Sequence, residues 1–113
     1  MLRSEIVALY AAEFAVPVEV VLQPRRRGSH LYSRIRMALI GTLLRQYQKR
    51  PLWPGSKGYS HVARALGLHH TTVMHAAERL PELLQERPGF ARRVRLIEAM
   101  IDEKELATQA CTA

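Results

Sequence analysis

Apolar residues recur along the chain at the spacing of helices, and the alternation typical of strands is absent. A first helix is predicted from a Ser4 cap to about Ala15, and Pro17 suits the first turn of a short second helix. A longer helix is predicted from a Ser29 cap to about Tyr47, and a last amphipathic helix near the C-terminus. The apolar stripes are Ile6, Leu9, Tyr10 and Phe14; Leu31, Ile35, Ala38, Leu39 and Leu43; and Phe90, Val94, Ile97 and Ile101. The pattern predicts an all-α, compact multi-helix bundle.

Pro and Gly residues interrupt this helical pattern. The segment 48–58 is predicted to be a linker, and its Trp53 is expected to pack over an edge of the core. Pro81 is expected to break or kink its helix, because proline lacks a backbone N–H and clashes with the preceding turn. Residues 1–105 are expected to form one domain, and residues 106–113 a flexible tail without core positions.

A helix-turn-helix is predicted over residues 59–78, YSHVARALGLHHTTVMHAAE. Ser60 is expected to cap the first helix, Gly67 to turn the chain in the left-handed conformation, and the second helix to open near His69. The positions expected between the two helices are Val62, Ala63, Leu66, Leu68, Val73 and Ala76. In such a motif the second helix lies in the major groove of DNA, with its N-terminal residues against base edges.

The polar residues at the start of that second helix suit contact with DNA. Threonine offers a hydroxyl to a phosphate or base and a methyl to thymine, and neutral histidine offers one donor and one acceptor. The helix N-terminus adds N–H groups and a partial positive charge that attract phosphate. The residues predicted to contact DNA from the motif are Ser60, His69, His70, Thr71, Thr72, His75 and Arg79.

The distribution of charge favours a polyanionic partner. Seventeen Lys and Arg against ten Asp and Glu give a formal net charge of +7. The segment from Val20 to Ala77 holds ten Lys or Arg, all five His and no acid, whereas charges nearly balance from Glu78 onward. A solvated surface normally mixes both signs, so an acid-free block of this length fits a face that lies against phosphates.

The sequence GLHHTTVMHAAERL resembles the signature of the C-terminal DNA-binding domain (domain IV) of the bacterial replication initiator DnaA. In that family Arg-Asp-His-Thr-Thr-Val opens the recognition helix. The resemblance extends over about Glu5 to Ile101, and it implies base or phosphate contacts by His70, Thr71 and Thr72.

The same resemblance assigns a role to the arginines near residue 26. They lie in a predicted basic loop bounded by Pro24 and Gly28. By resemblance, one arginine of this loop reaches into the adjacent minor groove, and one near the start of the following helix faces the DNA backbone. The candidates are Arg25, Arg26 and Arg27 for the groove, and Arg34 and Arg36 for the backbone.

The chain departs from the DnaA pattern at three places. Leu68 and His69 stand where the family has Arg-Asp, the turn is shorter, and the 48–58 linker is longer. The replaced Asp accepts a hydrogen bond from a base, so the family's recognition sequence is not expected here. The chain also lacks the GxxxxGK[ST] phosphate loop of an ATPase, and the pattern indicates an isolated DNA-reading module, as in a phage-type or accessory regulator.

Other classes of function have weaker support. The sequence offers no nucleophile–base–acid set and no carboxylates in the basic block, so we expect no enzyme. The histidine spacing matches no standard zinc pattern, and neither a metal nor a cofactor is expected. The single Cys111 suits a reducing compartment, and no signal pattern or apolar run of about 20 residues predicts export or a membrane span. We expect a cytoplasmic, nucleoid-associated protein.

The pattern therefore predicts sequence-specific binding to double-stranded DNA by a transcriptional regulator or a protein associated with a replication origin. It does not separate repressor, activator and origin-binding roles, and it leaves open a homodimer partner or another replication or transcription protein. The alternative of a different class is a helix-turn-helix that docks a protein or binds nucleic acid, including RNA, without sequence preference.

Overall fold

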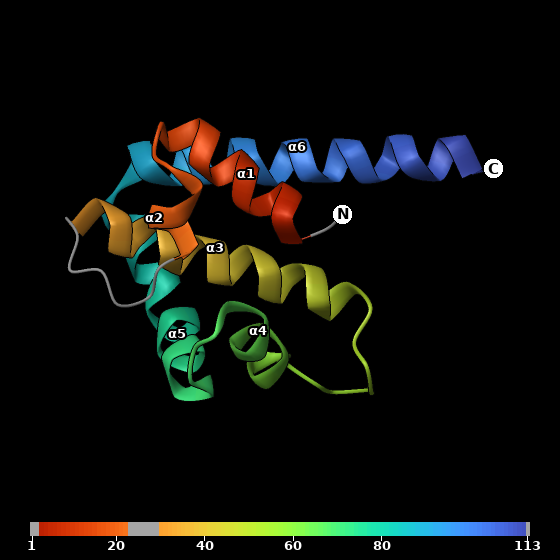
Figure 1. Ribbon diagram of the computed structural model, residues 1–113, viewed down its shortest axis with the longest axis horizontal. Coiled ribbons are helices and arrows are strands. Elements are labelled where there is room, and N and C mark those ends of the chain that lie inside the picture. Colours follow the sequence, from red (N-terminus) through yellow and green to blue (C-terminus); the bar gives the residue numbers. More distant parts are fainter. Residues whose placement is uncertain (1–2, 23–29, 113) are drawn as a thin grey trace.

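The computed structural model describes residues 3–22 and 30–112. These residues contain six helices and no strand. They are α1 (Arg3–Phe14), α2 (Val18–Leu22), α3 (His30–Lys49), α4 (Tyr59–Leu66), α5 (His70–Glu86) and α6 (Pro88–Thr112). In Figure 1, α3 runs through the middle of the molecule, with α1 and α6 above it and α4 and α5 below, and α2 overlaps the first part of α3 in this view. The prediction of an all-α multi-helix bundle is confirmed.

One hydrophobic core lies between α3 and the helices around it. The apolar stripes predicted for α1, α3 and α6 supply most of its residues. Its largest fully buried side chains include Tyr10, Ile6, Ile35, Leu39, Ile97 and Ile101. Leu31 differs from the prediction, because it lies in the first turn of α3 and is 38% exposed.

Tyr10 joins α1 to α3 inside this core. Its hydroxyl lies 2.6 Å from the hydroxyl of Thr42 and donates a hydrogen bond to the carbonyl of Ala38 at 3.1 Å. Burial raises the pKa of the Tyr10 hydroxyl, because the charged form loses its hydration. These bonds satisfy a buried polar group that would otherwise destabilise the core.

The starts of the helices agree only in part with the prediction. α2 begins directly after Pro17, whose carbonyl accepts the first hydrogen bonds of that helix, as expected. Ser4 and Ser60 do not cap, because α1 and α4 each begin one residue earlier and these serines lie in the first turn. The cap of α4 is instead Gly58, whose φ of 86° lies in the left-handed region that glycine tolerates. Ser29 lies outside the described residues.

Two helices are longer than predicted. Pro81 does not break α5, which continues beyond it. Leu80 and Leu84, on either side of the proline, pack against the core, and their burial offsets the hydrogen bond that proline cannot donate. Residues 106–112, expected to be a flexible tail, continue α6 as helix.

The connection between α3 and α4 folds over Tyr47 and not over Trp53. The hydroxyl of Tyr47 accepts a hydrogen bond from the N–H of Leu52 at 3.2 Å and lies 2.7 Å from the hydroxyl of Ser56. The buried ring of Tyr47 fills the edge of the core that we expected Trp53 to cover. Trp53 is 61% exposed, and the prediction that it packs on the core is wrong.

No helix in the described ranges combines the length and the apolar character needed to span a membrane.

Candidate nucleic-acid interface

The chain turns between α4 and α5 at Gly67, as predicted. Gly67 adopts the left-handed conformation, with φ 69° and ψ 31°. The N–H of Leu68 donates to the carbonyl of Ala63 at 2.8 Å, and the N–H of Gly67 donates to that of Arg64 at 3.4 Å. This pair of bonds is the Schellman arrangement, which satisfies the last carbonyls of α4 and fixes the direction of the following chain.

Small and apolar side chains hold the two helices together. Val62 and Ala63 of α4 are buried, as are Val73 and Ala76 of α5, and Val73 is 0% exposed. Leu66 and Leu68, which we expected between the helices, are partly buried and pack against the core. Because α5 also packs along α3, the position of its first turn is set by the body of the molecule.

His69 is the N-cap of α5, a role that the sequence analysis missed. Its backbone is extended, with φ −79° and ψ 146°, and its Nδ1 accepts a hydrogen bond from the N–H of Thr71 at 3.3 Å. The same nitrogen lies 2.8 Å from the Thr71 hydroxyl. Since Nδ1 accepts, the neutral ring carries its proton on Nε2, which is then a donor. Histidine is not among the preferred capping residues, so the sequence held no strong signal for this role.

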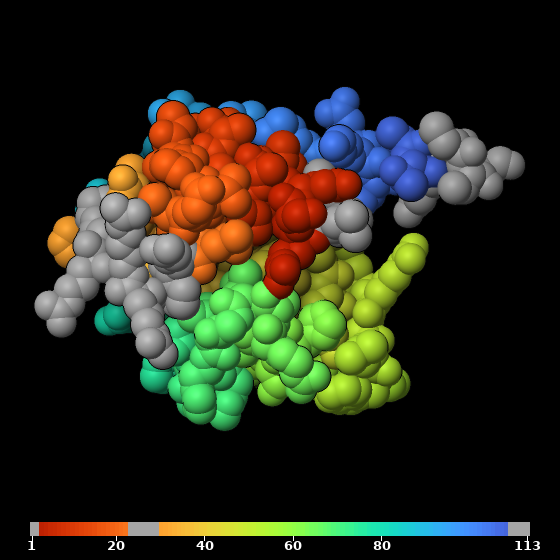
Figure 2. Space-filling view, in the orientation of Figure 1, coloured from red at the N-terminus to blue at the C-terminus, as the bar shows by residue number. Residues whose placement is uncertain are grey.

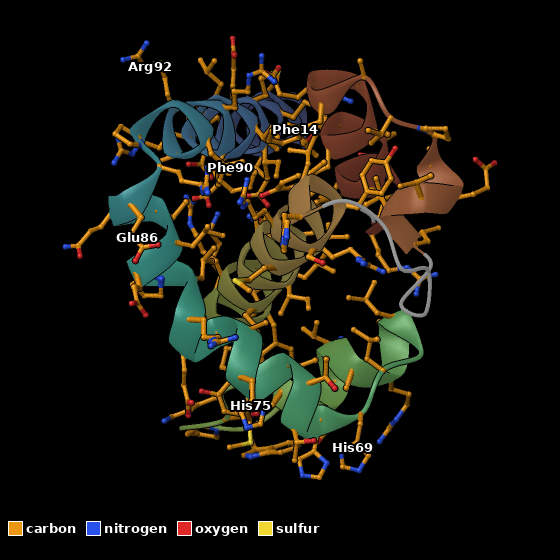
Figure 3. The ribbon with its side chains drawn as sticks, turned by 90° about the vertical axis from the view of Figure 1, so that its left-hand side faces the viewer. Phe14, His69, His75, Glu86, Phe90 and Arg92 are labelled. Carbon is orange, nitrogen blue, oxygen red and sulfur yellow. The ribbon has the colours of Figure 1, made fainter. Side chains whose placement is uncertain are left out.

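The other residues predicted for the recognition helix are exposed on one end of the molecule. Thr72, His75 and Arg79 follow at helical spacing, opposite the buried face of α5. The rings of His69 and His70 lie 4.5 Å apart. Figure 3 shows His69 and His75 projecting from the lower end, and Figure 2 shows that α4 and α5 form this end.

The acidic residues of α5 all lie in its second part. No acid precedes Glu78, and Glu78 and Glu82 are both exposed. The acid-free part of α5 is therefore its first two turns, which carry His70, Thr71, Thr72 and His75, whereas the predicted contact residue Arg79 follows Glu78.

The structure does not bring Arg34 together with His69. Arg34 is partly buried and lines a hollow with Phe14, Glu86 and Phe90. In Figure 3, Glu86 and Phe90 lie at the opposite end of α5 from His69, a separation of about 24 Å along a helix of this length.

The remaining predicted arginines add little to the described surface. Arg36 is partly buried and already has an interaction partner. Arg25, Arg26 and Arg27 lie outside the described residues.

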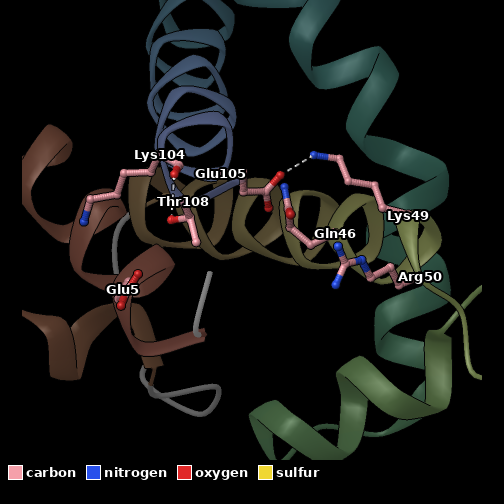
Figure 4. A pocket seen from close by; sticks show the side chains of 7 residues that line it. All are labelled: Glu5, Gln46, Lys49, Arg50, Lys104, Glu105 and Thr108. Atoms are coloured by element: carbon pink, nitrogen blue, oxygen red, sulfur yellow. Dashed lines mark hydrogen bonds and ion pairs between the residues drawn. The ribbon is translucent and has the colours of Figure 1, made fainter. Parts of the chain in front are cut away.

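Two bases of the acid-free segment are paired with acids of α6. Arg45 bonds to Glu98 and, at 2.7 Å, to Asp102. Lys49 lies 3.2 Å from Asp102 and 3.1 Å from Glu105, the latter drawn in Figure 4. The hydrogen bond from Arg45 is the main cause that lowers the pKa of Asp102. These partners are more than 50 residues apart in sequence, so the segment's composition alone suggested more available positive charge than the structure presents.

A second hollow beside this cluster mixes the two signs of charge. It lies between α1, α3 and α6 and is lined by Lys49, Arg50 and Lys104 as well as Glu5 and Glu105 (Figure 4). It contains none of the residues predicted to contact DNA. Within the described residues, no three His, Cys, Asp or Glu gather closely enough to hold a metal ion.

Comparison with known protein families, with curated proteins and with solved structures finds no match for this chain. The resemblance of its helix-turn-helix sequence to domain IV of DnaA stays a prediction.

Proposed function

We propose that this protein binds double-stranded DNA sequence-specifically, with the first turns of α5 in the major groove. The observation that carries the proposal is the exposed polar start of a helix whose position is fixed by packing. His70, Thr71 and Thr72 stand there with no acid before Glu78, and the buried side of the same helix holds them to the core.

The chemistry of this turn supports contact with base edges and phosphates. Backbone N–H groups at the start of α5 and the partial positive charge of the helix end attract a phosphate. The Nε2–H of His69 is a donor for guanine N7 or O6 or for a phosphate oxygen. Threonine side chains add a hydroxyl and a methyl that recognises thymine.

The biological setting follows from resemblance alone. By its likeness to DnaA domain IV, the protein is proposed to act in transcription regulation or at a replication origin. A homodimer partner or another replication or transcription protein would add affinity, because a single helix-turn-helix commonly reads one half-site of a longer operator.

The test is selection from a random duplex library, followed by fluorescence anisotropy on the enriched sequence with His70→Ala and Thr71→Ala. Each substitution is expected to cost about 1–3 kcal/mol of binding and to relax the preference at one or two base pairs. Thr108→Ala is the matched control, because it removes an exposed threonine of α6, away from α4 and α5.

The outcomes separate the candidate functions. An enriched motif whose recognition depends on His70 supports the proposal. Binding to every duplex with a steep salt dependence and no enrichment indicates non-specific DNA binding. Absence of binding to any duplex refutes the proposal and favours a helix-turn-helix used for protein docking.

A further inference from the structure

We propose that the α3–α4 loop, residues 50–58, is a second DNA-contacting element that lies against the sugar-phosphate backbone beside the groove occupied by α5. This inference rests on the proposed function and adds to it a contact surface outside the helix-turn-helix. It assigns Trp53 and Leu52 to apolar contact with deoxyribose, and Arg50 and Lys57 to phosphates.

The loop exposes two neighbouring large apolar side chains. Leu52 is 69% exposed and Trp53 is 61% exposed. Single exposed apolar residues are common on protein surfaces, but burial of two large apolar side chains exposed on one short loop would gain free energy. Tryptophan in particular buries a large area at a small cost in side-chain entropy.

The loop is held in this conformation by the residues behind it. The Tyr47 hydroxyl bonds to Leu52 and Ser56, as described above, and the side-chain amide of Gln48 donates to the carbonyl of Lys57 at 3.2 Å. A ring contact with His61, with centroids 4.9 Å apart, places Tyr47 against α4. These contacts hold the loop against α3 and α4, and Trp53 stays largely exposed on it.

The charges of the loop favour a phosphate-rich partner. Arg50 and Lys57 lie on either side of Leu52 and Trp53 in sequence and are both exposed, whereas no acid occurs between Val20 and Ala77. A protein partner of ordinary composition would meet a surface of mixed sign more readily. Exposed apolar side chains with Arg50 and Lys57 on either side match the apolar sugars and anionic phosphates of a nucleic acid backbone.

The position of the loop fits the geometry of a bound helix-turn-helix. In Figure 1 the loop and the start of α5 both reach the lower end of the molecule, on the two sides of α4. The first helix of such a motif crosses the DNA backbone when the second lies in the major groove. A loop that leads directly into α4 is then beside the backbone, where contacts position the protein without reading sequence.

The experiment uses the fact that Trp53 is the only tryptophan of the chain, so that its fluorescence reports on this loop alone. The intact protein is titrated with two duplexes that carry the selected site. One ends at the site, and the other extends beyond it on both sides. The extended duplex is expected to shift the emission of Trp53 and protect it from acrylamide, and the trimmed duplex to do so less and to bind more weakly.

Substitution gives the energetic test. Trp53→Ala is expected to weaken binding to the extended duplex about tenfold without changing the preferred sequence, whereas Trp53→Phe retains most of the affinity. Since Trp53 is largely exposed, neither change is expected to unfold the protein, which circular dichroism and thermal melting check. His70→Ala, run in parallel, alters sequence preference instead.

Failure of this inference and failure of the proposed function give different results. Anisotropy could report specific binding while the emission maximum of Trp53 and its quenching by acrylamide stay unchanged. In that case the loop does not touch DNA, although the recognition helix does. If no duplex binds, both proposals fail. If Trp53→Ala leaves DNA affinity unchanged but abolishes self-association in sedimentation, the loop is a protein-docking surface and the inference is overturned.

Discussion

His69 caps the start of α5, and we propose that it also contacts DNA. Its Nδ1 is engaged with the N–H and hydroxyl of Thr71, which leaves Nε2 as the atom that faces outward with a proton to donate. A capping role explains why a polar residue stands directly before the helix even without DNA. The contact role is the additional proposal, and the two are separable by substitution.

His69→Ala is expected to lower the free energy of unfolding by about 1 kcal/mol, because the N–H of Thr71 loses its acceptor. His69→Asn is the matched variant, since its side chain caps a helix but places no imidazole at the interface. We expect Asn to restore stability in chemical denaturation while leaving the DNA affinity reduced. Restored affinity with Asn would assign His69 to capping alone.

At the scale of elements, features that depend on residues close together in sequence could be predicted. Contacts between residues far apart in sequence could not. The turn at Gly67 and the buried faces of α4 and α5 follow from neighbours within about ten residues. The ion pairs that join α3 to α6, by contrast, connect Arg45 and Lys49 with acids that lie 53 or more positions away. Composition marks those residues as basic, but only the packing of α6 beside α3 shows that they are paired.

The same reasoning accounts for the loop and for the candidate site. Tyr47 precedes the 48–58 linker and Trp53 lies within it, and the sequence does not say which of these two aromatic residues is buried. Arg34 carries a suitable charge near the predicted basic loop, but the packing of α3 places it beside the end of α5. The start of α5, by contrast, could be located from its own residues, because a glycine turn and a polar first turn are local signals.

Two glycines provide a matched pair of tests for the elements that frame the site. Gly58 and Gly67 both have positive φ, of 86° and 69°, but a side chain added at Gly58 would approach the Tyr47 ring to 2.4 Å, whereas nothing lies within 4 Å at Gly67. Gly67→Ala is expected to cost about 1–2 kcal/mol from backbone strain. Gly58→Ala is expected to cost about 1–3 kcal/mol more, from overpacking.

Thermal or urea denaturation of the two variants measures the difference. Gly58→Ala is also expected to move the Trp53 emission in the free protein, because Tyr47 holds the loop that carries Trp53. Equal destabilisation of the two variants, with unchanged emission, would contradict the role assigned to Tyr47.

For the molecule as a whole, the formal net charge is +7. The basic residues fall into two groups, those paired with acids of the same chain and those available to a polyanion. Lys49 is held by Asp102 and Glu105, so it releases few DNA counterions on binding. Arg50 and Lys57 are exposed and flank the α3–α4 loop. A salt titration distinguishes the two groups, since each phosphate neutralised contributes about 0.9 to the slope of log K against log salt.

Arg50→Gln and Lys57→Gln are each expected to reduce that slope by about 0.9, and the double variant by about 1.8, with the sequence preference unchanged. Lys49→Gln, which removes the same charge one residue from Arg50, is expected to leave the slope unaltered. Anisotropy on the selected duplex at several salt concentrations makes the comparison. Equal reductions for all three would mean that DNA responds to total charge, and that the internal pairing of Lys49 with α6 does not select which bases meet phosphate.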